Sequence, residues 1–162
     1  MATKILVKKQ SKAVKQVETE IIELIGSSVE DMPDDVLEKV SRLLRDFYIC
    51  IENALGFIGH NLDGSVPSGE DVHRLLLDRM ADAVDKVRPP VLDKVLREEL
   101  QPYLQFRLDL EKDPETTSRD KERIIILIDS LKAVSATVRQ QLTDFFGDVN
   151  KFHGFEQNTA RQ

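Results

Sequence analysis

The sequence predicts an all-α protein, an antiparallel bundle of about five helices. Of its 162 residues, 32% are charged and only seven are glycine, a composition that favours helices. Apolar residues recur at steps of three and four, the period of a helix with one buried face. The single strand-like run, RIIILI, continues a helical period and has no partner strand in the chain.

Composition and charge narrow the function classes. Hydrophobic residues make up 41% of the chain, enough for one compact core, and Trp is absent. The net charge of −6 disfavours broad nucleic-acid binding through bulk charge. Five lysines nonetheless stand near the N-terminus with no acid among them: Lys4, Lys8, Lys9, Lys12 and Lys15. We interpret them first as a solvated helix face and second as a contact for a polyanion.

The lone cysteine, Cys50, lies in an apolar helical run and has no partner for an internal disulfide. We therefore expect a reducing, cytoplasmic compartment, and a Cys50 that packs as a small hydrophobic residue. No run of about eighteen apolar residues is present, so we expect no membrane span. The N-terminal stretch lacks the apolar core of a secretory signal.

The first two helices are predicted from their apolar stripes and breaks. One covers residues 4–25, with a polar first half. The next begins at Pro33, whose missing N–H is harmless in a first turn, and keeps one apolar face for about seven turns to Ile58. Gly59 and Gly64 are predicted to end it.

A shorter helix is predicted after the loop. Ser68 is its expected N-cap, and Ser68 with Asp71 resembles a capping box in which Asp replaces the usual Glu. The apolar stripe runs over residues 72–83. Pro89 and Pro90 are expected to stop this helix.

The last third of the chain contains two further helical patterns. The first covers residues 91–111, and Pro102 within it predicts a kink or a restart. The second covers about 119–147 and is capped by Thr117 or Ser118. We expect one helical domain over residues 1–150, with residues 1–31 as an N-terminal helical arm and 151–162 as a mobile tail.

A family resemblance follows from an ordered set of motifs in the run FYICIENALGFIGHNLDGSVPSGEDVHRLLLDRM, residues 47–80, and from VRPPVL and YLQFR further on. The residues that carry it are Glu52; Asp63, Gly64 and Ser65; Pro67, Ser68 and Gly69; His73, Arg74, Leu75 and Leu76; and 87–92 with 103–107. Residues 32–145 thereby resemble the HEPN superfamily, in particular the HepT-type toxins that pair with minimal nucleotidyltransferases. The resemblance implies a HEPN-like helical bundle.

The resemblance also implies a chemistry. HEPN toxins cleave RNA without a metal, using an Arg that neutralises phosphate and a His, four to six residues later, that moves a proton. A Tyr two residues beyond often accepts adenylate from the partner nucleotidyltransferase. Two such sites face each other across a homodimer.

This chain departs from that pattern. By its order along the chain, Arg107 falls on the motif Arg, but Lys112 stands at the His position and Pro114 at the Tyr position. No His lies between His73 and His153. A Lys of ordinary pKa is a poor proton shuttle near neutral pH. Three acids in the same segment would repel phosphate: Asp109, Glu111 and Asp113.

The remaining candidates for a catalytic site are Arg107, His73 and Glu52. Each has a structural alternative. Arg107 can pair with Glu111 at i,i+4, His73 can pack or cap at a helix start, and Glu52 can belong to a polar network. His60 and His73, together with the acids Asp63 and Glu70, are too mixed a set to predict a metal site, so we expect no metal and no cofactor.

We therefore expect a non-catalytic, HEPN-like homodimer that acts by binding a nucleotidyltransferase-type antitoxin, another protein, a nucleotide or RNA. One alternative is an active ribonuclease that uses an unusual site, for example Arg107 with His73 brought near in space. Another is a helical scaffold that has lost the family activity entirely.

Overall fold

The computed structural model describes residues 2–26 and 28–160, with side chains up to residue 150. The described part is all-α, as the sequence predicts, with six α-helices and one π-helical segment. These are α1 (Ala2–Ile25), α2 (Asp34–Ile58), η1 (Gly59–Asp63), α3 (Val72–Met80), α4 (Lys94–Lys112), α5 (Pro114–Thr117) and α6 (Lys121–Ala160).

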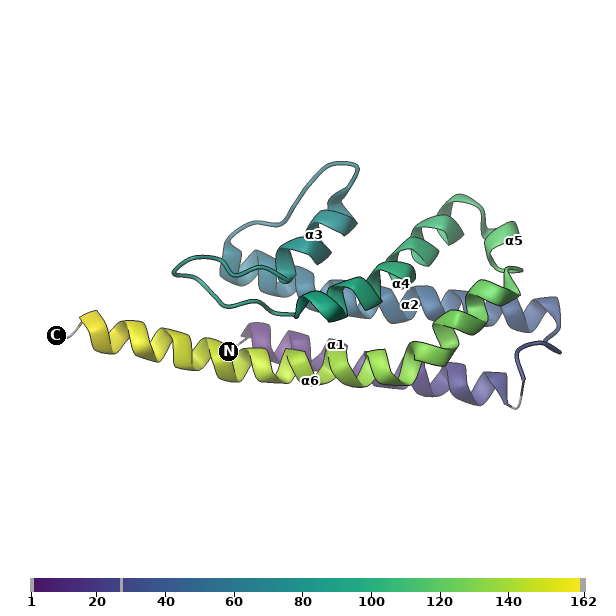
Figure 1. Cartoon of the computed structure of the whole chain (residues 1–162), viewed down its shortest axis with the longest axis horizontal. Helices are drawn as coiled ribbons and strands as arrows, with labels where there is room; N and C mark the ends of the chain where they lie inside the picture. The colour runs from purple at the N-terminus through teal and green to yellow at the C-terminus, as the bar shows by residue number, and fades with distance from the viewer. Residues whose placement is uncertain (1, 27, 161–162) are drawn as a thin grey trace.

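Three long helices form the body of the molecule (Figure 1). α1 and α2 form an antiparallel hairpin, and α6 runs antiparallel to α1 and packs on it, while α4 packs across α2 and α6. α3 and α5 are short and lie on the same side as α4. The core between these helices is built from the predicted stripes, among them Val14, Ile21, Leu37, Val40, Leu44, Phe47, Ile51, Leu104, Ile124, Leu131 and Val138.

α1 belongs to the same core as the rest of the bundle. Val14 and Ile21 are fully buried against neighbouring helices. Glu18, also buried, pairs with Lys15 at 2.5 Å, so its charge is compensated at the edge of the core. The helix of the expected N-terminal arm therefore packs along the bundle.

α2 ends through a change of helix type. Gly59 continues the helix into the π-helical turn η1, and Gly64 then ends it with φ 75°, a left-handed conformation that costs glycine little. A Cβ at Gly59 would lie 3.3 Å from Met80 and from Val66, so α3 and the loop before it approach the backbone closely here.

The predicted start of α3 at Ser68 is wrong. The helix begins at Val72 after Asp71, and no side chain caps it. Gly69 adopts φ 102°, a conformation that turns the chain away from a helix directly after Ser68. The turn at Gly69 thus replaces the expected capping box of Ser68 and Asp71.

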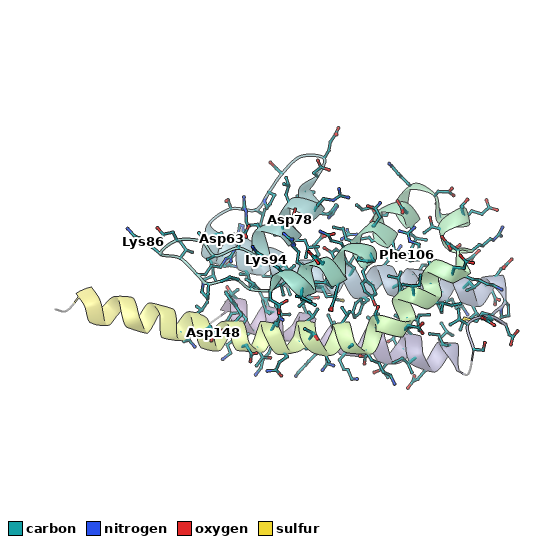
Figure 2. All side chains as sticks on the ribbon, in the orientation of Figure 1. Asp63, Asp78, Lys86, Lys94, Phe106 and Asp148 are labelled. Atoms are coloured by element: carbon teal, nitrogen blue, oxygen red, sulfur yellow. The ribbon has the colours of Figure 1, made fainter. Side chains whose placement is uncertain are left out.

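The predicted stop of α3 at the two prolines is also wrong, because α3 ends earlier, at Met80. The Met80 carbonyl accepts hydrogen bonds from the backbone N–H groups of Val91 and Leu92, at 2.9 and 3.1 Å. The loop 81–93 returns toward α4 and has Lys86 near its tip (Figure 2). It is held by the buried Arg88, which donates to both carboxylate oxygens of Asp63 at 2.6 and 2.9 Å. Long-range contacts therefore set this helix end.

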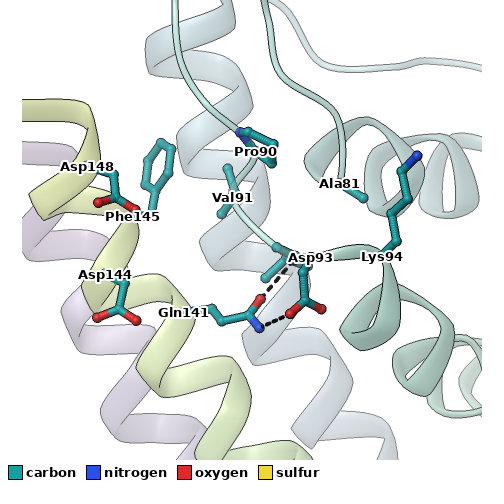
Figure 3. Close-up of a pocket in the computed structure, with 10 residues that line it drawn as sticks. Ala81, Pro90, Val91, Asp93, Lys94, Gln141, Asp144, Phe145 and Asp148 are labelled. Atoms are coloured by element: carbon teal, nitrogen blue, oxygen red, sulfur yellow. Dashed lines mark hydrogen bonds between the residues drawn. The ribbon is translucent and has the colours of Figure 1, made fainter. Parts of the chain in front are cut away.

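α4 begins at Lys94 with Asp93 as its cap, and the Asp93 side chain accepts from Leu96 N at 2.7 Å. Asp93 also exchanges two hydrogen bonds with Gln141 of α6, which fastens the start of α4 to α6 (Figure 3). The restart expected at Pro102 is absent, since α4 runs through it. Pro102 and Glu98 are both exposed, so solvent can satisfy the Glu98 carbonyl that lacks a helical donor.

The start of α6 differs from the sequence prediction. Asp113 caps the short α5, and Asp120, rather than Thr117 or Ser118, accepts from Arg123 N at 3.2 Å at the start of α6. Thr117 lies within the short helix α5 and Ser118 is its C-cap, so neither residue caps α6.

α6 also extends further than predicted. It continues past Gly147 to Ala160, because a helical glycine costs only about 1 kcal/mol relative to alanine and no proline follows. The expected tail, 151–162, is thus helical as far as Ala160, and residues 161–162 lie outside the described part. The mobility of this segment stays a prediction.

Candidate functional site

Three helices bring the three predicted site residues into one cluster. Glu52 lies in the second half of α2, His73 in the first turn of α3, and Arg107 in the second half of α4. We call Glu52, His73, Arg107 and Glu111 the Glu52 cluster. Glu52, His73 and Arg107 are far apart in the sequence, so only the packing of α3 and α4 on α2 brings them together.

Glu52 is the centre of the cluster. Its carboxylate lies 2.8 and 2.9 Å from Nδ1 of His73, and its Oε1 lies 2.9 Å from Nη1 of Arg107. The Arg107 contact is an ion pair whose N–H directions do not meet the geometry of a hydrogen bond. On its other side Arg107 donates from Nε to Glu111 at 3.3 Å, which confirms the predicted i,i+4 pair.

The cluster lies at the edge of the core. The side chains of Glu52, His73 and Arg107 are 16%, 28% and 12% exposed. Solvent can reach the His73 ring most easily, whereas the Arg107 guanidinium is largely covered. Neither motif order nor residue spacing predicts that the Arg107 side chain is largely covered.

Tyr48 lies one turn before Glu52 on α2 and is fully buried. Within the described part of the chain its hydroxyl has no hydrogen-bond partner. Burial raises the pKa of Tyr48 well above its ordinary value, the Glu52 carboxylate raises it further, and Arg107 acts in the opposite direction. Tyr48 thus contributes a neutral, buried wall to the cluster, and it is a residue that the sequence reasoning did not single out.

This geometry has some of the parts of an acid–base site. A carboxylate that accepts from Nδ1 of a His fixes the ring and leaves Nε2 free to move a proton. A guanidinium nearby can neutralise a phosphate. Here, however, the same carboxylate serves both groups, so a phosphate at Arg107 would have to displace Glu52 or share its charge.

The segment after Arg107 carries no acid–base group in a protected setting. Lys112 is the exposed last residue of α4, and Pro114 is the exposed first residue of α5. Asp109 pairs with Arg123 at 2.8 Å. Partial burial acts to raise the pKa of Asp109, but hydrogen bonds from Gln105 and Arg123 outweigh it and hold that pKa below its ordinary value.

The two histidines that sequence reasoning weighed as metal ligands point to different partners. His73 binds Glu52, while Asp63 is occupied by Arg88 and His60 is exposed on η1. Among the residues with described side chains, no group of three or more His, Cys, Asp or Glu is placed to hold a metal ion. Cys50 is half-buried against the core, and burial raises the pKa of its thiol.

A hollow of 650 Å³ lies beside the cluster between α2, α4 and α5. It contains equal numbers of arginines and glutamates: Arg42, Arg45, Arg119, Glu38, Glu111 and Glu115. Such a balance gives no clear preference for an anion or a cation.

One model of a protein family matches most of the chain. A model described as HepT-like protein matches residues 39–149, from the first turns of α2 far into α6. The chain belongs to the HepT-like protein family. No curated protein and no solved structure matches it. The match leaves α1 outside, and it covers every member of the Glu52 cluster. No helix in the described part of this HepT-like chain is both long and apolar enough to cross a membrane.

Proposed function

We propose that this HepT-like protein acts by binding and does not cleave RNA. The observation that carries the proposal is the state of Arg107. Its guanidinium is largely buried and carries a carboxylate on each side, Glu52 and Glu111. A phosphate at Arg107 would have to compete with both carboxylates, because they already compensate the charge of the guanidinium.

The second support is the missing proton carrier. The resemblance places Lys112 where HEPN toxins have their His, and Lys112 is exposed at the end of α4. A lysine loses its proton near neutral pH only when burial or a neighbouring cation lowers its pKa. Lys112 is exposed, and its neighbours in the chain are the carboxylates Glu111 and Asp113 rather than cations.

The partner that the resemblance implies is a nucleotidyltransferase-type protein, with nucleotide or RNA as further candidates. Pro114, at the position of the family's modified Tyr, has no hydroxyl to accept adenylate. Adenylylation at this position is therefore excluded by chemistry, and the interaction with such a partner would depend on surface contact alone.

An RNA-cleavage assay on the purified protein tests the proposal. We expect no cleavage above the buffer control, because general acid–base catalysis typically contributes a hundredfold to ten-thousandfold of rate and the group that supplies it is absent. The pair Lys112→His with Pro114→Tyr tests whether only these groups are missing, and Lys112→Gln with Pro114→Ala is its matched control. Robust cleavage by the unmodified protein, lost on Arg107→Ala, would overturn the proposal.

A second candidate function is favoured by one observation. His73 and Arg107 both contact Glu52, so the structure supplies a His close to the motif Arg from another helix. An active ribonuclease could use His73 Nε2 as the proton carrier. In that case cleavage would be lost on His73→Ala and kept on Lys112→Gln.

A further inference from the structure

A basic groove lies between α1 and α6, away from the Glu52 cluster. Two adjoining hollows form it, of 160 Å³ and 460 Å³. Ser11 of α1 and Thr143 of α6 line both, so the hollows lie side by side along the two helices.

The charges along the groove are of one sign. Its lining includes four lysines of α1 and one arginine of α6: Lys4, Lys8, Lys12, Lys15 and Arg139. No carboxylate lines either hollow. Lys4 and Lys15 are eleven residues apart, about 16 Å along the helix. In a chain with net charge −6, this is a local reversal of sign.

Most of these cations have no internal partner. Among the residues with described side chains, Lys4, Lys8 and Lys12 form no ion pair, and Arg139 Nε donates to the neutral hydroxyl of Ser135 at 3.3 Å. Lys15, at the opposite end of the groove from Lys4, pairs with Glu18. A solvated helix face, the simpler interpretation of the lysines, does not require an arginine from a second helix to complete it.

The nearest acid on α6 is Asp144. Its carboxylate accepts a hydrogen bond at 2.9 Å from Gln140, which lines the larger hollow, so Asp144 stands at the rim of the groove. Asp144 itself lines the hollow on the α4 side of α6, together with Asp93, Lys94 and Asp148 (Figure 3). The lining of the α1–α6 groove is therefore basic, with one carboxylate at its rim.

An aromatic ring completes the groove. Phe146 is half-buried, packs edge-on against Phe145 with ring centroids 5.3 Å apart, and lines the smaller hollow beside Lys4 and Lys8. A groove of cations with a partly exposed aromatic ring is the combination that binds single-stranded nucleic acid, since the cations follow the phosphates and a ring can stack on a base.

We propose that the α1–α6 groove binds the phosphate backbone of a single-stranded nucleic acid. An acidic protein segment could pair with the lysines equally well, but it has no base that would stack on the partly exposed ring of Phe146. Single-stranded nucleic acid can form both contacts and is therefore the better match. This inference goes beyond the loss of cleavage proposed above. It holds whether or not the Glu52 cluster is catalytic, because the groove shares no residue with that cluster.

Fluorescence anisotropy with labelled oligo(dT) of about twelve nucleotides tests the groove on the full chain. DNA lacks the 2′-hydroxyl that RNA cleavage requires, so binding is measured without any contribution from cleavage. With about four phosphate contacts we expect log K to fall with log salt at a slope of about −3. Lys8→Gln with Lys12→Gln should lower affinity about tenfold and reduce the slope by about 1.4.

The control pair is Lys39→Gln with Lys94→Gln, two exposed lysines outside the groove whose loss changes the net charge equally. It should bind like the unmodified protein. Phe146→Leu should weaken binding about tenfold with an unchanged salt slope, because it removes stacking and no charge. Circular dichroism confirms that each variant keeps its helices.

Three outcomes would overturn the proposal. These are no binding of oligo(dT) at about 50 mM salt, equal loss of affinity in the groove and control pairs, and poly-glutamate binding as tight as oligo(dT). The last outcome would assign the groove to an acidic protein. Cleavage results on Arg107 and His73 variants leave this test unaffected, so the two proposals can fail independently.

Discussion

At the scale of single residues, the proposed function depends on how Glu52 divides its carboxylate between His73 and Arg107. His73 Nδ1 contacts both oxygens, while Arg107 reaches one of them and takes a second carboxylate from Glu111. In a partly buried setting such a shared carboxylate stabilises both neighbours. Because two carboxylates compensate the charge of Arg107, its guanidinium attracts a further anion only weakly.

His73→Ala tests how much the fold depends on this contact. We expect a loss of about 1 kcal/mol in the free energy of unfolding, because one hydrogen bond disappears at a site open to water and Arg107 still compensates Glu52. Urea unfolding gives the value, with His60→Ala, an exposed residue, as the control. A loss of several kcal/mol would show that His73 is a structural residue and would remove it as a site candidate.

At the scale of elements, the apolar stripes predicted the long helices well. α1, α2 and α4 lie within a few residues of their predicted bounds, since one apolar face of period 3.6 is a strong local signal. The ends of α3 and the start of α6 were wrong. They depend on Arg88, on the φ of Gly69 and on the short α5, all of which act through tertiary contacts or turns that periodicity does not report.

The candidate site was predictable to the same degree. The order of the motifs predicted Glu52, His73 and Arg107 as candidate site residues. The i,i+4 spacing predicted the pair of Arg107 with Glu111. Their meeting at one carboxylate was not predictable, because it depends on how α3 and α4 cross α2. Tyr48 was missed because a buried tyrosine and a core apolar residue give the same signal in a stripe.

Arg88 holds the loop 81–93, and its removal should show this directly. Arg88→Met leaves the Asp63 carboxylate, 5% exposed, without a cation, and breaking a buried pair in this way typically costs about 3–5 kcal/mol. Urea unfolding should show a loss of that size, while Arg74→Met, at an exposed residue, should change little. Adding Asp63→Asn to Arg88→Met should recover part of the loss. Unchanged stability in Arg88→Met would contradict the role given to this pair.

At the scale of the whole molecule, the bundle leaves apolar side chains uncovered. Ile126, in the run RIIILI of α6, is 66% exposed, and Leu75 of α3 is also exposed. Together with the facing dimers that the HEPN resemblance implies, these side chains lead us to expect a homodimer whose interface involves α3 and α6. Light scattering at micromolar concentration should give twice the chain mass of 18.5 kDa.

Ile126→Glu tests that interface. A carboxylate buried between two copies without a partner costs several kcal/mol, enough to move a micromolar dimer to monomer, while the same change on an exposed face leaves the fold intact. Val95→Glu, at an equally exposed apolar residue of α4, is the matched control and should keep the dimer mass. A monomer for the unmodified protein would contradict the homodimer. A dimer that survives Ile126→Glu would move the interface away from RIIILI, and the exposed Ile126 would then need another explanation.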